Sequence, residues 1–215
     1  MADVQAPRRL TPKGRETRDR IVRAAADLIF AHGVASTSID DVRQAAGVSG
    51  SQMTHYFPDK RSLVRAVIAF HEENVMSQHR QPELGGLDSF EALELCAEHN
   101  IARQRDANGV GGPGFSSLAG EVAETDPGIR ADLAGGFVRW EALFRYGLLA
   151  MRDRGELRPD ADPAVLAAGL LASLQGGMLL ARTTRDVRYL ESALGAALEH
   201  VRSYAAAPDP AGSPT

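Results

Sequence analysis

The chain has 215 residues, of which 44% are hydrophobic and 6% aromatic, a composition that suits a packed core in one or two domains. Its single cysteine, Cys96, excludes a disulfide framework. We expect no membrane span, because no apolar run approaches the roughly 20 residues that a span needs. The N-terminal sequence also lacks the apolar region of a signal peptide, so we expect a cytoplasmic protein.

The formal net charge of −4 is unevenly distributed along the chain. Residues 1–65 contain eleven Lys or Arg and seven Asp or Glu, a balance of +4, so the remaining residues carry −8. A basic head on an acidic body is the distribution that favours binding to nucleic-acid phosphates. A basic run by itself is more often a solvated surface, and only its overlap with the motif described below favours DNA binding.

Hydrophobic periodicity predicts an all-α fold with about nine helices and no strands. Asp162 followed by Pro163 is a strong helix start, and Gly33 predicts the end of the first helix. Outside the motif described next, we expect helices over residues 17–32, 60–78, 89–106, 115–123, 127–154, from 163 onward, and through 187–201. The expected domains are a flexible basic arm at 1–13, a DNA-binding domain at 14–59, a helical domain at 60–205 and a flexible tail at 206–215.

Residues 37–60, TSIDDVRQAAGVSGSQMTHYFPDK, predict two short helices joined by a tight turn. Ser38 caps the first helix, and Asp41 completes a capping box three residues later. Gly47 supplies the left-handed residue that ends this helix. The segment is therefore typical of a helix-turn-helix.

The second of these helices is predicted to begin at Ser49 and to stop before Pro58. Its outward residues are small or hydrogen-bonding, and readout of the DNA major groove by a second helix requires such a face. We expect base contacts from Gly50, Ser51, Gln52 and Thr54.

Together with IVRAAADLIFAHG upstream and HYFPDKRSLVRAVI downstream, this segment resembles the DNA-binding domain of the TetR family of bacterial transcriptional regulators. The resemblance implies a three-helix head and a larger helical domain that dimerises and holds a small-molecule inducer. Many members carry a lysine, a glycine and a tyrosine where this chain has Gly50, Ser51 and Thr54, so no operator sequence is transferred. By the same resemblance, phosphate contacts are expected from Thr37, Ser38, His55, Tyr56 and Lys60.

Two later stretches, GFSSLAGEVAETDPGIRADLAGGFVRWEALF and GELRPDADPAVLAAGLLASLQGGMLLARTTRD, resemble the C-terminal domain of one subgroup of that family. The subgroup includes the lincomycin-resistance repressor and flavonoid-responsive repressors. The resemblance implies an apolar or aromatic effector between the fourth and eighth helices. The aromatic residues among the candidates for this site serve equally well as ordinary core residues. The candidate lining residues are Phe70, Asn100, Arg103, Phe115, Leu118, Trp140, Phe144, Gln175 and Met178.

The last two expected helices suggest a dimer interface. One carries an apolar stripe, and the other lines up small residues that permit a close helix contact. The family pairs these helices across a two-fold axis, as in isologous homodimers, and the alternative is that both stripes pack inside the monomer. The predicted interface residues are Ala172, Gly176, Leu190, Leu194, Leu198 and Val201.

Other chemistries find little support in the sequence. Gly109, Gly111 and Gly114 satisfy the pattern G-x-G-x-x-G, yet a helix rather than a strand precedes them. The histidine spacing fits no metal site, and we predict no catalytic residue, metal or cofactor. The sequence therefore predicts a ligand-responsive repressor that binds a near-palindromic DNA operator as a homodimer and is released by an effector. The alternatives are an activator, an effector-independent DNA binder, or a helical small-molecule carrier or enzyme with a vestigial DNA head.

Overall fold

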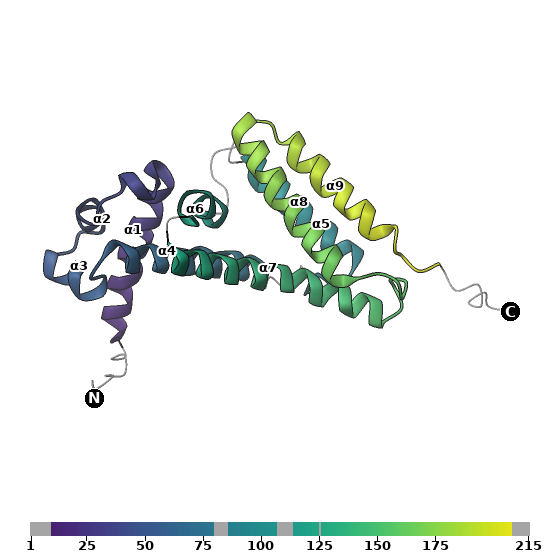
Figure 1. Cartoon of the computed structure of the whole chain (residues 1–215), viewed down its shortest axis with the longest axis horizontal. Helices are drawn as coiled ribbons and strands as arrows, with labels where there is room; N and C mark the ends of the chain where they lie inside the picture. The colour runs from purple at the N-terminus through teal and green to yellow at the C-terminus, as the bar shows by residue number, and fades with distance from the viewer. Residues whose placement is uncertain (1–9, 80–85, 107–113, 125, 208–215) are drawn as a thin grey trace. The chain divides into compact units, whose positions relative to one another are not determined.

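The computed structural model of the chain describes residues 10–79, 86–106, 114–124 and 126–207. These residues form helices and no strand, with one isolated β-bridge between Leu157 and Ala205 (Figure 1). The helices in the described residues are α1 Pro12–Ser36, α2 Ile39–Ala46, α3 Gly50–Tyr56, α4 Lys60–His79, α5 Phe90–Asp106, α6 Gly114–Val122, α7 Pro127–Asp153, α8 Pro163–Thr184 and α9 Arg188–Arg202. The all-α prediction is confirmed.

The first helix extends beyond its predicted bounds at both ends. Thr11 caps it, and Pro12 follows at the start, where a missing N–H costs no helical hydrogen bond. Gly33 has the non-helical angles φ +81° and ψ 163°, so the regular helix is interrupted at Gly33, as predicted, and a further helical stretch to Ser36 follows the kink. Lys13 is therefore helical and not part of a flexible arm. Residues 1–9 of the predicted arm lie outside the described residues.

The chain divides into two compact units. The head unit comprises residues Met1–Glu72 and Gly114–Leu133, and the body unit comprises Glu73–Pro113 and Ala134–Thr215. The sequence predicted one boundary near residue 59. The structure differs, because it assigns α6 and the first turns of α7 to the same unit as α1, α2 and α3.

Two helices of the head unit, α2 and α3, are too short to be stable alone, so each is held by burying one face. Ile21 and Ala25 of α1 are fully buried, as are Val42 of α2 and Met53 of α3. α6 packs beside α1. Its Phe115 is 1% exposed. Helix α6 thus completes the head core from a distant part of the sequence.

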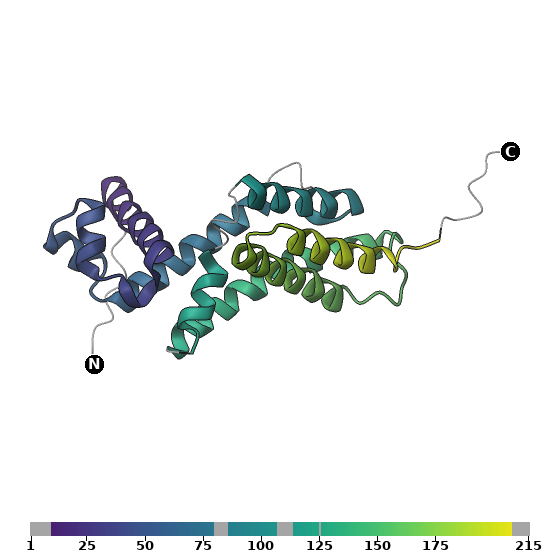
Figure 2. The ribbon, with the colours of Figure 1, turned by 90° about the horizontal axis from the view of Figure 1, so that it is seen from above.

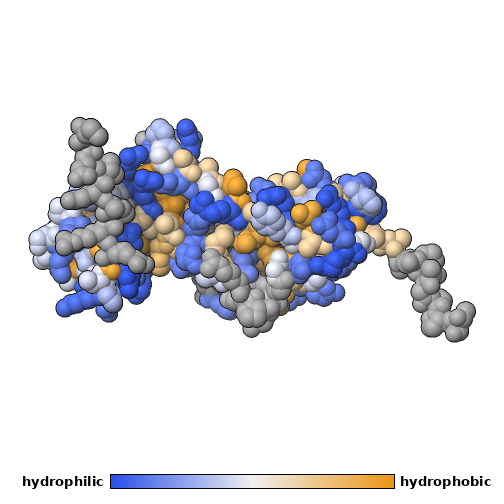
Figure 3. Space-filling view, turned by 90° about the horizontal axis from the view of Figure 1, so that it is seen from below, coloured by the Kyte–Doolittle hydropathy of each residue, from blue (hydrophilic) through white to orange (hydrophobic). Residues whose placement is uncertain are grey.

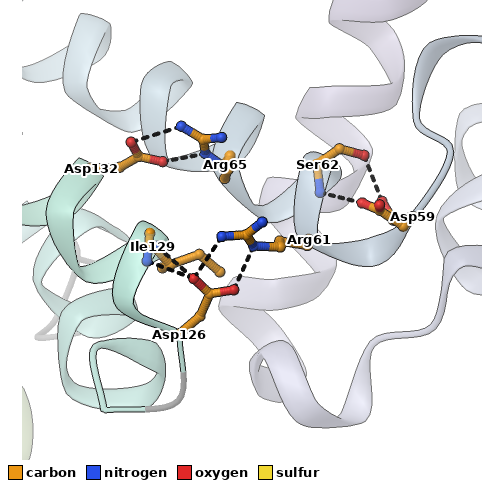
Figure 4. A network of polar contacts seen from close by, with 8 residues as sticks. Asp59, Arg61, Ser62, Arg65, Asp126, Ile129 and Asp132 are labelled. Atoms are coloured by element: carbon orange, nitrogen blue, oxygen red, sulfur yellow. Dashed lines mark hydrogen bonds and ion pairs between the residues drawn. The ribbon is translucent and has the colours of Figure 1, made fainter.

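Polar contacts between distant parts of the sequence reinforce this packing. The Glu121 Oε1 atom of α6 accepts a hydrogen bond of 2.9 Å from the backbone N–H of Ala35 in α1. Arg61 of α4 donates from Nε and Nη2 to Asp126 at 2.5 and 3.0 Å, and Arg65 pairs in the same bidentate way with Asp132 (Figure 4). The two ion pairs join segments more than 60 residues apart, and no local sequence pattern predicts them.

The core of the body unit gathers around α8. The buried residues of α8 in this core include Leu166, Ala167, Leu170, Leu171 and Leu174, and α7 and α9 add others. α8 and α9 lie side by side in both views of the ribbon (Figure 2). A Cβ atom added at Gly177 would lie 2.9 Å from the Cα of Leu190, so only glycine permits this approach of the two helices.

A second face of α8 is apolar and exposed within the chain. Val165 and Leu179 are each 63% exposed, and a Cβ added at Gly176 would meet nothing within 4 Å. Hydrophilic residues cover most of the face shown in Figure 3, and hydrophobic residues emerge between them. Exposed apolar surface of this kind is typical of a helix that binds a partner.

The expectation that no apolar run approaches a membrane span is wrong for α8. Among the described residues, this one helix is long and apolar enough to cross a membrane by length and composition. The reason is that uncharged residues follow one another from 163 to 181, with small Ala and Gly among the leucines. The core helix of a soluble protein passes the same test, and 44% of the apolar window is buried.

We predict that Gly177→Ala destabilises the protein by about 1 to 3 kcal/mol, since the added methyl group must push α9 away from α8. Urea denaturation followed by circular dichroism measures the loss. Gly120→Ala in α6 is the control, because a Cβ there meets nothing within 4 Å; it should be neutral or stabilising by up to about 1 kcal/mol. Equal stability of the two variants would contradict the close approach of α8 and α9.

Candidate nucleic-acid interface and ligand pocket

The capping box predicted for α2 is present, and α3 has a second one. In α2, the Ser38 hydroxyl accepts from the backbone N–H of Asp41 at 3.1 Å, and Asp41 accepts from the backbone N–H of Ser38 at 2.9 Å. Gly47 ends α2 in the left-handed conformation with φ 61° and ψ 43°. Ser49 and Gln52 exchange the same two hydrogen bonds at the start of α3. These local bonds fix where α3 begins.

The outward face of α3 is exposed as predicted. Met53 points into the core, whereas the residues predicted to contact bases are all exposed: Gly50, Ser51, Gln52 and Thr54. The capping bond occupies the Oε1 atom of Gln52, so the Nε2 amide group is the part that can donate to a base edge. Such a donor suits acceptor atoms in the major groove, for example N7 of a purine.

The residues predicted to contact phosphates differ in availability. Thr37 is 3% exposed and its hydroxyl donates to the Gly33 carbonyl at 2.8 Å, so its side chain is not available to a phosphate. His55 is exposed and Tyr56 is half-buried beside it. The Lys60 Nζ atom donates to the Ala35 carbonyl at 3.2 Å.

Ser38 also differs from expectation, because its hydroxyl donates to the Asp41 carboxylate at 2.6 Å. Its side chain already serves the α2 cap on both sides, as donor and as acceptor. The resemblance that suggested Thr37 and Ser38 as phosphate contacts therefore overlooks their local hydrogen bonds. Within this pair, the exposed Ser38 alone has a side chain at the surface.

The basic charge of the head is smaller than the sequence count suggests. Two of the eleven cations counted in residues 1–65, Arg61 and Arg65, are bound to Asp126 and Asp132. The pKa of Asp126 is lowered to about 2, chiefly by the hydrogen bond from Arg61, so this pair stays charged near neutral pH. Residues 1–72 and 114–133 together contain twelve Lys or Arg and twelve Asp or Glu. Attraction to phosphates must therefore come from local placement of charge, with Lys13, Arg15 and Arg23 exposed on α1.

The residues predicted to line the effector site do not all belong to one unit. Phe70, Phe115 and Leu118 are part of the head unit, where the last two are core residues. The remaining six belong to the body unit, although Arg103 is exposed and donates to Gln78. Gln175 is half-buried and Met178 is buried in the body core.

A pocket in the body unit contains two of the predicted residues, Asn100 and Phe144. It has an empty volume of about 280 Å³, part of it open to solvent. Its walls come from α5, α7, α8 and α9, not from α4, and consist of Leu93, Cys96, Ala97, Asn100, Phe144, Leu170, Leu174, Leu194 and Leu198. Burial raises the pKa of the Cys96 thiol to about 11, so Cys96 acts here as an apolar wall residue.

Three buried side chains of the body unit carry a nitrogen atom without a hydrogen-bond partner in the described structure. They are His79 at the end of α4, Gln104 on α5 and Trp140 on α7. A buried polar group left unpaired costs about 1 to 3 kcal/mol, so each of these atoms calls for an explanation. Of these three residues, only Trp140 was among the predicted lining residues. Gln104 follows the pocket residue Asn100 by four positions, one helical turn, and this spacing was the available signal.

The structure corrects the predicted dimer interface. Leu190, Leu194 and Val201 are 0%, 5% and 1% exposed within the chain, and Leu198 lines the pocket. These α9 residues pack against α8 and α5, so the alternative of packing inside the monomer holds for them. Ala172 and Gly176 of α8 are exposed, as an interface requires.

Comparisons with known proteins agree with this architecture. The family described as "Bacterial regulatory proteins, tetR family" matches residues 21–67, and that described as "Tetracyclin repressor-like, C-terminal domain" matches residues 90–197. Neither match separates the lincomycin-resistance and flavonoid-responsive subgroup from other members, so the narrower resemblance stays a prediction.

Sequence relatives and solved structures point the same way. An uncharacterised HTH-type transcriptional regulator of Mycobacterium tuberculosis is 30% identical over 179 residues, which cover 81% of this chain and 88% of the relative. The transcriptional regulator AcuR of Cereibacter sphaeroides is 27% identical, with 83% and 84% covered. A TetR-family regulator from Cytophaga hutchinsonii has the same fold, with a TM-score of 0.81 at 20% identity over 94% of this chain and all of that one. The capped helix-turn-helix, the helical body and these matches together show that the chain belongs to the TetR family of bacterial transcriptional regulators.

Proposed function

We propose that this regulator is a cytoplasmic repressor that binds a near-palindromic operator as a homodimer and releases it when a small effector enters the body unit. The observation that carries the proposal is α3, a capped helix whose exposed face offers small and hydrogen-bonding side chains. A single helix of this length reads few bases, and two-fold repressors gain specificity by reading two half-sites about 34 Å apart.

The exposed apolar face of α8 supports the homodimer. Ala172 and Gly176 leave open space for a second helix, and Val165 and Leu179 flank them on the same face. An identical face on a second copy would cover this surface in an isologous contact. The pocket among α5, α7, α8 and α9 supports an effector site, because it combines apolar walls with few polar groups.

We predict that Gln52→Ala changes which operator bases are preferred, by about 1 to 3 kcal/mol at one base position, whereas Lys60→Ala weakens binding to all sequences alike. The reason is that a contact to a base edge discriminates between sequences and a phosphate contact does not. Fluorescence anisotropy with the operator, single-base variants and scrambled DNA measures both effects.

Because Gln52 also closes the α3 capping box, this variant needs a control for lost helix stability. Asp41→Ala opens the equivalent box of α2 and leaves the α3 face intact. It should lower thermal stability without altering base preference. If Gln52→Ala and Asp41→Ala change affinity for every sequence equally, the reading position assigned to Gln52 is wrong.

We predict that Ala172→Glu gives folded monomers that lose high-affinity operator binding, because two carboxylates would meet in the buried centre of the interface. Val138→Glu is the matched control: Val138 is 64% exposed on α7, and this variant should stay dimeric. Leu194→Glu should instead unfold the body, since it buries an unpaired charge in the chain's own core. Sedimentation velocity and circular dichroism separate the outcomes, and a dimeric Ala172→Glu would move the interface elsewhere.

A further inference from the structure

We infer that the effector is a small uncharged aromatic molecule that carries both a hydroxyl group and a carbonyl oxygen, bound beside the pocket residue Phe144 in the region of His79, Trp140 and Gln104. The inference rests on the proposed function, because it assigns the chemical class of the effector at that site. Its basis is the set of unpaired buried nitrogen atoms.

These side chains border one region of the body unit. The His79 ring centroid lies 5.8 Å from that of Trp140 and 6.0 Å from that of Phe144, and Phe144 is a wall of the pocket. Trp140 and Phe144 are one turn apart on α7. Gln104 is likewise one turn beyond the pocket residue Asn100 on α5.

The end of α4 is tied to α5 at the same place. Arg103, the neighbour of Gln104, donates a hydrogen bond to Gln78, the neighbour of His79. His79, Gln104 and Trp140 are respectively 8%, 4% and 3% exposed, so solvent does not satisfy their nitrogen atoms. A ligand in this region is therefore the natural partner for them.

The hydrogen-bonding capacity of each nitrogen atom can be worked out. His79 Nδ1 lies 2.8 Å from the Val75 carbonyl oxygen, which can only accept, so Nδ1 carries the proton. Burial lowers the pKa of His79 and favours the neutral ring. In that ring Nε2 is an acceptor and needs a donor, such as a hydroxyl group. Trp140 Nε1 and Gln104 Nε2 are donors and need acceptor oxygen atoms, such as a carbonyl.

The surroundings favour an uncharged, flat ligand. None of the side chains that line the pocket is an acid, a lysine or an arginine, and an ionised group buried without a partner is far more costly than a hydroxyl. The His79 ring meets the rings of Trp140 and Phe144 edge to face, so aromatic side chains surround the unpaired His79 nitrogen, and an aromatic ligand packs favourably against such side chains.

The test uses four probes built on one ring. 4-Hydroxyacetophenone carries the hydroxyl group and the carbonyl, 4-methoxyacetophenone lacks the donor, 4-ethylphenol lacks the carbonyl, and 4-hydroxybenzoate carries a negative charge. Trp140 is the sole tryptophan of the chain, so its fluorescence reports binding directly in the full-length protein. We expect 4-hydroxyacetophenone to bind about tenfold more tightly than each of the other three.

Two variants assign the contacts. His79→Phe should abolish the preference for the hydroxyl over the methoxy probe, and Gln104→Leu should reduce the preference for the ketone over the ethyl probe. Each replacement removes an unpaired buried nitrogen, so neither should lower the melting temperature of the ligand-free protein. Val138→Ala, at an exposed position of α7 outside the pocket, is the control and should leave both preferences unchanged.

The outcomes separate this inference from the proposed function. Equal affinity for all four probes, absence of binding, or variants that leave both preferences intact would overturn the ligand class. Operator binding is measured in parallel by anisotropy. A probe that binds with the expected preferences and leaves the operator bound would overturn effector-controlled release while supporting the ligand class. Operator release that does not depend on the hydroxyl or carbonyl group of the probe would overturn the ligand class while supporting effector-controlled release.

Discussion

The body unit depends on α8 burying one face while leaving another open. Leu170 and Leu174 belong to its core and also form a wall of the pocket, and Gly177 lets α9 approach within contact of the same helix. The opposite face, with Val165 and Leu179, is not covered by any of the residues that the structure describes. One uncharged helix thus supplies the core, the pocket wall and the proposed subunit contact. A change in the packing of α8 would therefore alter the core, the pocket wall and the proposed subunit contact together.

The head unit solves a different problem, because its short helices have little core of their own. α6 completes that core from a distant part of the sequence, and charged pairs bind the start of α7 to α4. In this arrangement two cations of the head, Arg61 and Arg65, are engaged in ion pairs within the protein. The unit that carries α3 is therefore balanced in charge, and its affinity for DNA depends on which surface each cation occupies.

Sequence reasoning succeeded where structure is decided locally. The boxes at Ser38 and Ser49 and the left-handed Gly47 need only neighbours within a few residues, so the start and end of α2 and α3 could be predicted. It failed where distant segments meet. The apolar stripe of α9 has the same spacing whether it faces a second copy or the chain's own core, and only packing decides. The burial of Thr37, the pairing of Arg61 and the unpaired nitrogen of His79 likewise depend on residues far away in sequence or on tertiary burial.

The pairs Arg61 with Asp126 and Arg65 with Asp132 have a consequence for how ionic strength acts on this protein. Both are exposed, so dissolved salt screens them. Salt also competes with the protein for the DNA counterion atmosphere. Raising ionic strength therefore loosens the attachment of α7 to α4 within the head while it weakens attraction to phosphates. The slope of affinity against salt concentration is accordingly a composite of two equilibria, the opening of the ion pairs and the binding of DNA. If this slope were taken as a simple count of phosphate contacts, the number of contacts would be overestimated.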